Sequence, residues 1–127
     1  MAISIYQASV PSFVRSLQST KKFLKKGETY VKSKNIKPEV LLNCRLMADM
    51  LPLTSQIQIA SDAAKGAGAR LAGINVPKFA DNEKSFADLY KRIDRTIKFL
   101  DKIKPAQMDG SEDEIITIKL PMKTIKF

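Results

Sequence analysis

Apolar residues in the first quarter of the chain recur at the spacing of an α-helix. At 100° per residue, the rotation of a helix, they fall on a single stripe. Arg15, Lys22 and Lys26 project from the opposite side. Pro11 is tolerated only near a helix start or at a kink. The pattern predicts one long amphipathic helix that ends near Ser33. Its stripe consists of Tyr6, Val10, Phe13, Leu17, Leu24 and Val31.

A second, shorter helix is predicted over residues 38–48. Pro38 suits its first turn because no amide partner is needed there, and Glu39 is favoured near the positive end of a helix. Pro52 interrupts the pattern, since proline disfavours the helical conformation in the residue before it. A kink or a short loop is therefore expected at 50–52.

Residues 53–73 show two apolar stripes about 90° apart on one predicted helix. Two such flanks predict two packing neighbours. The run of small residues at 63–69 allows another helix to approach closely, although each glycine costs about 1 kcal/mol in helix propensity. Gly73 is expected to end the helix. One stripe holds Leu53, Ile57, Ala60, Ala64, Ala67 and Leu71, and the other holds Gln56, Ile59, Ala63, Gly66 and Arg70.

The next helix is expected to follow a crossing loop at 74–80. Asp81 is the predicted N-cap, Asp88 and Arg92 are an expected i,i+4 ion pair, and Pro105 should stop the helix. Its core stripe consists of Phe86, Leu89, Tyr90, Ile93, Ile97 and Leu100.

Beyond a turn at 108–110, the periodicity changes from helical to alternating. Ile116, Ile118 and Leu120 alternate with polar residues, which predicts a strand, and residues 124–127 are its hairpin partner across Pro121. Because short links favour antiparallel neighbours, the sequence predicts an all-α antiparallel up-down bundle. It has three main helices, a short helix at 38–48 and a small C-terminal β-hairpin, in one domain over residues 1–127.

The composition shows which catalytic and metal-binding residue types the chain lacks. Its 127 residues are 44% hydrophobic and 28% charged, as in an ordinary folded domain, but they include no His and one Cys. Histidine-based catalysis and the common zinc sites are therefore excluded, and we expect no metal and no cofactor. Cys44 lacks a histidine base to activate it, so a packed small hydrophobe is the preferred interpretation.

The net charge of +9 favours weak association with nucleic acid or an anionic surface. Lys21, Lys22, Lys25 and Lys26 could follow phosphates, but no aromatic RNA-binding motif or zinc finger accompanies them. A solvated helix face is preferred. The N-terminus lacks the features of a signal peptide, and the sequence contains no run of eighteen apolar residues. A cytoplasmic protein that does not span a membrane is expected.

Several segments match the residue pattern of a protein family in order and spacing, which is a more specific signal than helical periodicity. They resemble a DinB-like helical-bundle family, the domain-of-unknown-function family numbered nineteen ninety-three. The resemblance covers almost all of the chain and implies a bundle fold without an established activity. The segments lie at 5–14, 41–46, 49–53, 56–66, 69–73, 77–83 and 92–93.

Two departures from that resemblance affect the expected function. The wider superfamily includes thiol-dependent transferases that hold a divalent metal with histidines, and this chain has none. Members of the closer family continue past the strand region into a further core helix, whereas this sequence ends at Phe127. The expectation is a domain truncated relative to the family, or one whose exposed flank is covered by another subunit.

Polar residues in the most family-like stretch form the candidate ligand site. An arginine there could clamp an anionic group as a planar fork, with a carboxylate orienting it. The alternative is a structural network that fixes the kink at 50–52 and the helix crossings. The candidates are Arg45, Asp49, Gln56, Asp62, Lys65 and Arg70.

Three function classes remain at this point. The preferred one is a non-catalytic module, without a metal, that binds a small anionic ligand or another protein. The alternatives are a metal-free enzyme related to the thiol-dependent transferases and weak nucleic-acid association through the first helix. The two apolar stripes of the helix predicted at 53–73 would be partly exposed to water in a monomer, so a homodimer is also expected.

Overall fold

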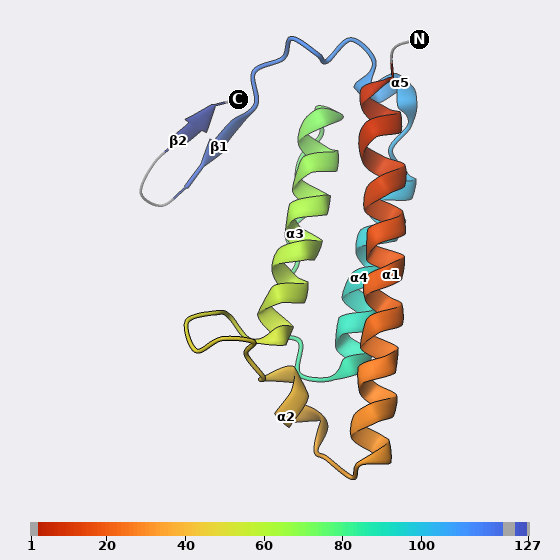
Figure 1. Cartoon of the computed structure of the whole chain (residues 1–127). Coiled ribbons are helices and arrows are strands. Elements are labelled where there is room, and N and C mark those ends of the chain that lie inside the picture. Colours follow the sequence, from red (N-terminus) through yellow and green to blue (C-terminus); the bar gives the residue numbers. More distant parts are fainter. Residues whose placement is uncertain (1–2, 121–123, 127) are drawn as a thin grey trace.

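Three long helices form a bundle with short helices at its ends and a strand pair beside it (Figure 1). The computed structural model describes residues 3–120 and the backbone of residues 124–126. The helices are α1 (Ile5–Ser33), α2 (Pro38–Leu42), α3 (Leu53–Leu71), α4 (Phe86–Asp101) and α5 (Pro105–Met108), and the strands are β1 (Thr117–Lys119) and β2 (Thr124–Lys126).

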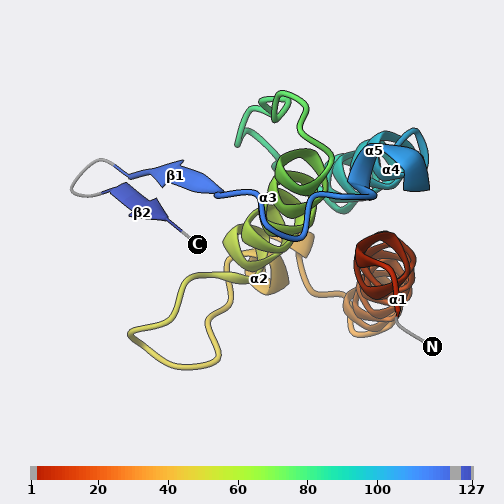
Figure 2. The ribbon, with the colours of Figure 1, turned by 90° about the horizontal axis from the view of Figure 1, so that it is seen from above.

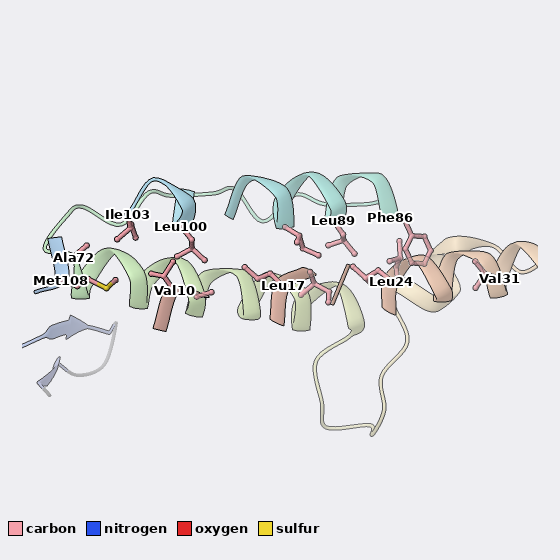
Figure 3. Close-up of a cluster of buried hydrophobic side chains, with 14 residues drawn as sticks. Val10, Leu17, Leu24, Val31, Ala72, Phe86, Leu89, Leu100, Ile103 and Met108 are labelled. Atoms are coloured by element: carbon pink, nitrogen blue, oxygen red, sulfur yellow. The ribbon is translucent and has the colours of Figure 1, made fainter. Parts of the chain in front are cut away.

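Helix α1 starts at a capping box. The Ser4 hydroxyl accepts a hydrogen bond from the Gln7 amide, and the Gln7 side chain accepts one from the Ser4 amide. These bonds satisfy donors that the first turn leaves free. The predicted stripe faces the core, where Val10, Leu17, Leu24 and Val31 are buried (Figure 3). The predicted helix is confirmed, including its end at Ser33.

Helix α2 is shorter than predicted, because it ends at Leu42 and not near residue 48. The segment at 43–52 is a loop that protrudes from the lower end of the bundle in Figure 1. Leu46 and Met47 are exposed there. A short helix depends on burying one face. Without that burial, the segment adopts turns instead.

The C-terminal end of α3 is a Schellman motif, as Gly73 led us to expect. The amide of Ile74 donates to the Ala69 carbonyl, and the amide of Gly73 donates to the Arg70 carbonyl. Gly73 has a φ of 70°, a conformation in which glycine avoids the steric cost of a side chain.

Helix α4 starts four residues later than predicted. Its N-cap is Ser85, whose hydroxyl accepts from the Asp88 amide. Asp81 is drawn instead to Arg92, 2.9 Å away. The expected Asp88–Arg92 pair is also wrong, because the Asp88 carboxylate accepts from the Lys84 amide in the capping turn.

Helices α3 and α4 run parallel, which corrects the predicted antiparallel up-down order. Contacts advance together along both helices, from Ser61 with Thr96 to Gly68 with Leu100 and Ile103. The connecting residues 72–85 return along the bundle (Figure 1). A link of this length spans about 45 Å when extended, whereas 19 helical residues rise about 28 Å. Helix α1 runs antiparallel to both.

The side of α3 that packs against α4 is not one of the two predicted stripes. It consists of small and polar residues, among them Ser61, Gly68 and Ala69, which are fully buried or nearly so. The predicted second stripe is open over its first part, with Gln56, Ile59 and Ala63 exposed, whereas Gly66 is buried and Arg70 is half-buried. Close approach at the small residues is confirmed, since a Cβ at Gly68 would lie 2.6 Å from Leu100 Cδ2.

Helix α5, the last helix before the strands, packs against the core. Pro105 begins α5, and Met108 ends it as a buried side chain whose sulfur lies 3.6 Å from the Ser9 hydroxyl. Strands β1 and β2 pair antiparallel, with Ile118 opposite Ile125. Pro121 and Phe127, which the predicted hairpin includes, lie outside the described residues. The strand pair projects away from α3 on the side opposite α1 (Figure 2).

Candidate functional site

A buried arginine occupies the junction of α3, α4 and the loop between them. The Arg92 side chain is 1% exposed and meets three carboxylates. Its Nη2 lies 2.7 Å from Asp62, and its Nη1 lies 2.7 Å from Glu83 and 2.9 Å from Asp81. Nη1 also donates to the Ala80 carbonyl. Arg92 therefore fixes the returning loop to both helices.

Burial and hydrogen bonding oppose each other at Glu83. Burial alone would raise the pKa of this carboxyl, but hydrogen bonds from Arg92 and Gln58 outweigh it, so the pKa of Glu83 is lowered. Burial likewise acts to lower the pKa of Arg92, and its carboxylate partners reverse that effect, so the pKa of Arg92 is raised. Both side chains are therefore charged at neutral pH and paired with each other.

Phe79 holds the same loop through contacts with cations. The ammonium of Lys65 lies 4.3 Å from the ring centroid of Phe79, and the guanidinium of Arg95 lies 4.1 Å from it. Lys65 also donates to Asp62 at 2.9 Å. The side chains around Arg92 thus largely pair with one another, as expected for a structural junction. Arg92 Nε is the exception within the described residues, because it is buried without a hydrogen-bond partner.

The six predicted site residues do not form one site. Only Asp62 and Lys65 come together, within the cluster around Arg92. Gln56 and Arg70 are fourteen residues apart on α3, which places them about 21 Å apart along the axis. Arg70 folds back over Gly66, since a Cβ built there would lie 2.5 Å from Arg70 Nη1.

Arg45 and Gln56 instead stabilise the loop at 43–52, as the structural alternative expects. Arg45 Nη1 donates to the Met50 carbonyl at 2.7 Å, and Gln56 Nε2 donates to the Leu51 carbonyl at 3.3 Å. Asp49 is exposed in the same loop. The Leu53 amide closes the base of the loop by donating to the Cys44 carbonyl. Cys44 itself is exposed, so the predicted packed position is wrong.

Sequence reasoning missed Arg92 as the centre of the charged cluster, although the signal was present. Arg92 lies three residues after Leu89 and four before Thr96, and all three are buried. This spacing places Arg92 on the core face of α4. A charged residue in a core stripe requires partners, so the need for a carboxylate near Arg92 was predictable, although its identity was not.

An apolar surface without a covering element lies between α1 and α3, with Phe86 at the start of α4 beside it. Two adjoining hollows of about 340 and 390 Å³ follow these helices and share Thr20. Phe23 beside the first hollow is 68% exposed, and Ile59 on α3 is 50% exposed. The lower hollow is lined by Thr20, Phe23, Leu24, Gly27, Leu41, Leu53, Ile57 and Phe86, and the upper by Phe13, Ser16, Leu17, Thr20, Ala60, Ala63, Ala64 and Ala67. We call this surface the α1–α3 face.

Charge is absent from the α3 half of the α1–α3 face. Helix α3 carries three charged residues, Asp62, Lys65 and Arg70. The first two are paired with each other on the α4 side, and Arg70 lies at the C-terminal end. An exposed helix surface normally carries polar or charged residues on its solvent side. About four turns of α3 therefore present only small, apolar or uncharged residues on this face, while the half-exposed Asp62 lies on the α4 side.

The lysines of α1 divide between two sides. Lys21 pairs with Asp94 of α4 at 2.8 Å, and Lys25 lies 5.9 Å from the centroid of the Tyr90 ring. Tyr90 donates to Glu28, and burial together with this carboxylate raises the pKa of Tyr90 to about 12. Lys22 and Lys26 are exposed. The α1–α4 contact therefore engages part of the predicted basic cluster.

The chain matches a known protein family over almost its whole length. The model of a family described as a domain of unknown function, DUF1993, matches residues 5–127. The chain belongs to the DUF1993 family. This confirms the resemblance carried by the motifs, and the family description assigns no activity.

A solved structure supports the fold of this DUF1993 chain. The chain is similar to a DinB family member protein from Shewanella denitrificans, with 32% identity and a TM-score of 0.84. The match covers 95% of this chain and 70% of the other. The DinB-like all-α fold is therefore shown. No curated protein sequence matches the chain.

The described residues show neither a cluster of metal-ligating side chains nor a membrane-spanning helix. Within residues 3–120, no three side chains of the His, Cys, Asp or Glu type are grouped as ligands for a metal ion. None of the helices in the described part has the length and apolar character that crossing a bilayer requires.

Proposed function

We propose that this DUF1993 chain is a non-catalytic protein-interaction module that receives a helix of its partner on the α1–α3 face and needs no metal for it. The observation that carries the proposal is an apolar groove whose α3 wall has no charge over about four turns. A contiguous apolar surface of this kind on a folded chain marks an interaction site.

The dimensions of the face fit a helix. The hollows follow α1 from Phe13 to Gly27 and α3 from Leu53 to Ala67. Fourteen helical residues rise about 21 Å, so the groove could accommodate roughly four turns of another helix. Ala60, Ala63 and Ala67 lack bulk, which permits the short interaxial distance of close helix packing.

The polar candidates favour this function over capture of a small anion. Arg45 is held by a carbonyl of its own loop, and Lys65 and Arg92 are paired with carboxylates. Binding an anion would require breaking these contacts. The enzymatic alternative needs Arg45, Asp49 and Asp62 around one cleft, but Asp62 is turned to Arg92 while the others lie in the loop at 43–52.

Affinity capture with a matched pair of variants tests the proposal. Ala63→Arg places a charged side chain on the exposed wall of the groove, and Ala87→Arg does the same on exposed α4. A protein retained by the tagged native chain from an extract of the source cells is identified, purified and titrated against all three chains. We expect its Kd to rise at least tenfold with Ala63→Arg and to stay constant with Ala87→Arg.

The proposal is wrong if every retained protein, including untagged copies of the chain itself, binds the native chain and Ala63→Arg equally well. Melting curves accompany the titration, so that loss of binding is separated from loss of folding. Because Ala63 and Ala87 are both exposed in helices, neither substitution should change the free energy of unfolding by more than about 0.5 kcal/mol.

A further inference from the structure

We propose that the loop at 43–52 inserts its apolar side chains into the surface of a bilayer that contains anionic lipids. The loop protrudes from the lower end of the bundle (Figure 1). Its residues do not line the hollows of the α1–α3 face. The proposal therefore concerns a second surface and does not depend on the function proposed for the first.

Large apolar side chains of this loop lie in water. Leu46 is 84% exposed and Met47 is 62% exposed, and Met50 and Leu51 are exposed as well. Val40 on the neighbouring helix α2 is also exposed. Loops are normally built from polar residues, glycine and proline. Grouped apolar side chains of this size mark an interaction surface.

The backbone of the loop is hydrogen-bonded within the loop itself. At its base, the Leu53 amide donates to the Cys44 carbonyl at 3.0 Å. Nearer the tip, Arg45 Nη1 donates to the Met50 carbonyl at 2.7 Å, and the Met50 amide donates to the Met47 carbonyl at 3.0 Å. Backbone groups that enter lipid must keep such bonds, because hydrocarbon offers no replacement. The loop can therefore insert its side chains without rearranging.

Basic side chains lie beside the loop, around the turn between α1 and α2. Lys32, Lys34 and Lys37 are exposed there, at the same lower end of the molecule (Figure 1). Residues 32–51 contain four basic and two acidic side chains, and the whole chain has a net charge of +9. Each lysine or arginine close to an anionic bilayer adds to the attraction. This end of the molecule therefore complements a negatively charged lipid surface.

The form of the loop favours a lipid surface over a nucleic acid or a protein. The loop has no aromatic side chain that could stack on a base. It protrudes as an irregular segment, and offers neither a groove nor a strand edge with which a peptide would pair (Figures 1 and 2). A fluid bilayer receives protruding apolar side chains without a matching pocket, and its anionic headgroups attract the lysines.

Cosedimentation with vesicles is the first test. The native chain is mixed with vesicles of phosphatidylcholine, with or without about one third of phosphatidylglycerol. We expect a partition coefficient at least tenfold higher on the anionic vesicles, and a decrease when the salt concentration rises to about 0.5 M. Leu46→Asp should lower the coefficient at least tenfold. Ile59→Asp, the same change at an exposed residue of α3, should stay within about twofold of the native value.

A native chain that does not sediment with the anionic vesicles overturns the proposal, and so does equal binding by Leu46→Asp and the native chain. A protein partner that is lost with Leu46→Asp, while the native chain binds no vesicles, would make the loop a protein contact and also overturn it. Ala63→Arg should keep native vesicle binding, because the α1–α3 face is a different surface. Vesicle binding therefore stands or fails separately from the proposed function.

A tryptophan at the tip reports insertion directly, because the sequence contains no tryptophan. On anionic vesicles, the emission of Leu46→Trp should move to shorter wavelength and be quenched by brominated lipid, whereas that of Ile59→Trp should not change. Both positions are exposed, so melting curves should show that each variant keeps the native fold. An unshifted emission from vesicle-bound Leu46→Trp would place the contact elsewhere and contradict the proposal.

Discussion

The two sides of α3 differ in both polarity and burial. Toward α4, α3 presents Ser61, Asp62, Lys65 and Gly68, and every charge or hydroxyl there has a partner. Toward the groove beside α1, it presents Ala60, Ala63, Ala64 and Ala67, which line an open hollow of about 390 Å³. The polar side of α3 is buried and the apolar side is exposed to solvent, which is the reverse of what hydrophobicity alone suggests. We call them the closed side and the open side.

This difference shows that burial follows complementarity and not apolar character alone. Polar groups are buried against α4 because Arg92 supplies charge to three carboxylates and Thr96 meets Ser61 at 2.7 Å. A buried polar group that keeps its hydrogen bonds loses little on folding, while an apolar surface without a neighbour stays in water. The predictions below test each side.

The largest effect is expected on the closed side, from Arg92→Met. Removing the guanidinium leaves Glu83, whose side chain is 6% exposed, as a buried carboxylate without its cation. Breaking a buried ion pair in this way costs several kcal/mol. We expect a loss of about 3 kcal/mol in the free energy of unfolding, measured by urea denaturation. Lys98→Met, at an exposed residue of the same helix outside the cluster, serves as the control and should cost under about 0.5 kcal/mol.

A leucine substituted on each side of α3 should change the free energy of unfolding by different amounts. Gly68→Leu forces its side chain into Leu100 and Ile103, since even a Cβ would lie 2.6 Å and 3.1 Å from them. Overpacking of this kind costs about 1–3 kcal/mol. Ala63→Leu, on the open side, should cost under about 0.5 kcal/mol. Equal melting temperatures for the two variants would show that the closed side is not packed as described.

The pH dependence of the free energy of unfolding should show whether Glu83 is ionised and paired with Arg92. Its folded pKa lies below the ordinary value of 4.5, so its stabilising contribution is present above pH 4.5 and is lost as the pH falls through the folded value. Glu83→Gln removes that contribution, about 1 kcal/mol at pH 7. We expect the stability difference between the native chain and the variant to shrink between pH 5 and 3. A constant difference over that range would contradict the assignment.

The smallest effect on stability is expected on the open side, from Ile59→Lys. This side chain is 50% exposed, so its replacement removes few contacts within one copy. The free energy of unfolding, extrapolated to low protein concentration, should change by under about 0.5 kcal/mol. A loss above 1 kcal/mol in a chain that is monomeric under the same conditions would mean that Ile59 is packed within its own chain.

The sequence by itself determined the three main helices, the stripe on α1 and the end of α3 at Gly73, because these depend on residues close together in the chain. Amphipathic periodicity requires only 3.6-residue spacing, and the glycine cap requires only a residue that accepts a φ of 70°. The core residues Val10, Leu17 and Leu89 follow from the same local rule.

Tertiary structure alone decided the direction of α4, the end of α2 and the position of the charged cluster. Whether Asp81 caps a helix or pairs with Arg92 depends on where the loop at 72–85 returns, and that path is set by contacts with α3. Asp62, Glu83 and Arg92 are up to thirty residues apart in sequence, so local patterns do not pair them. The same reason separates two of the candidate site residues: Gln56 and Arg70 share one helix, but about 21 Å of helical rise lies between them.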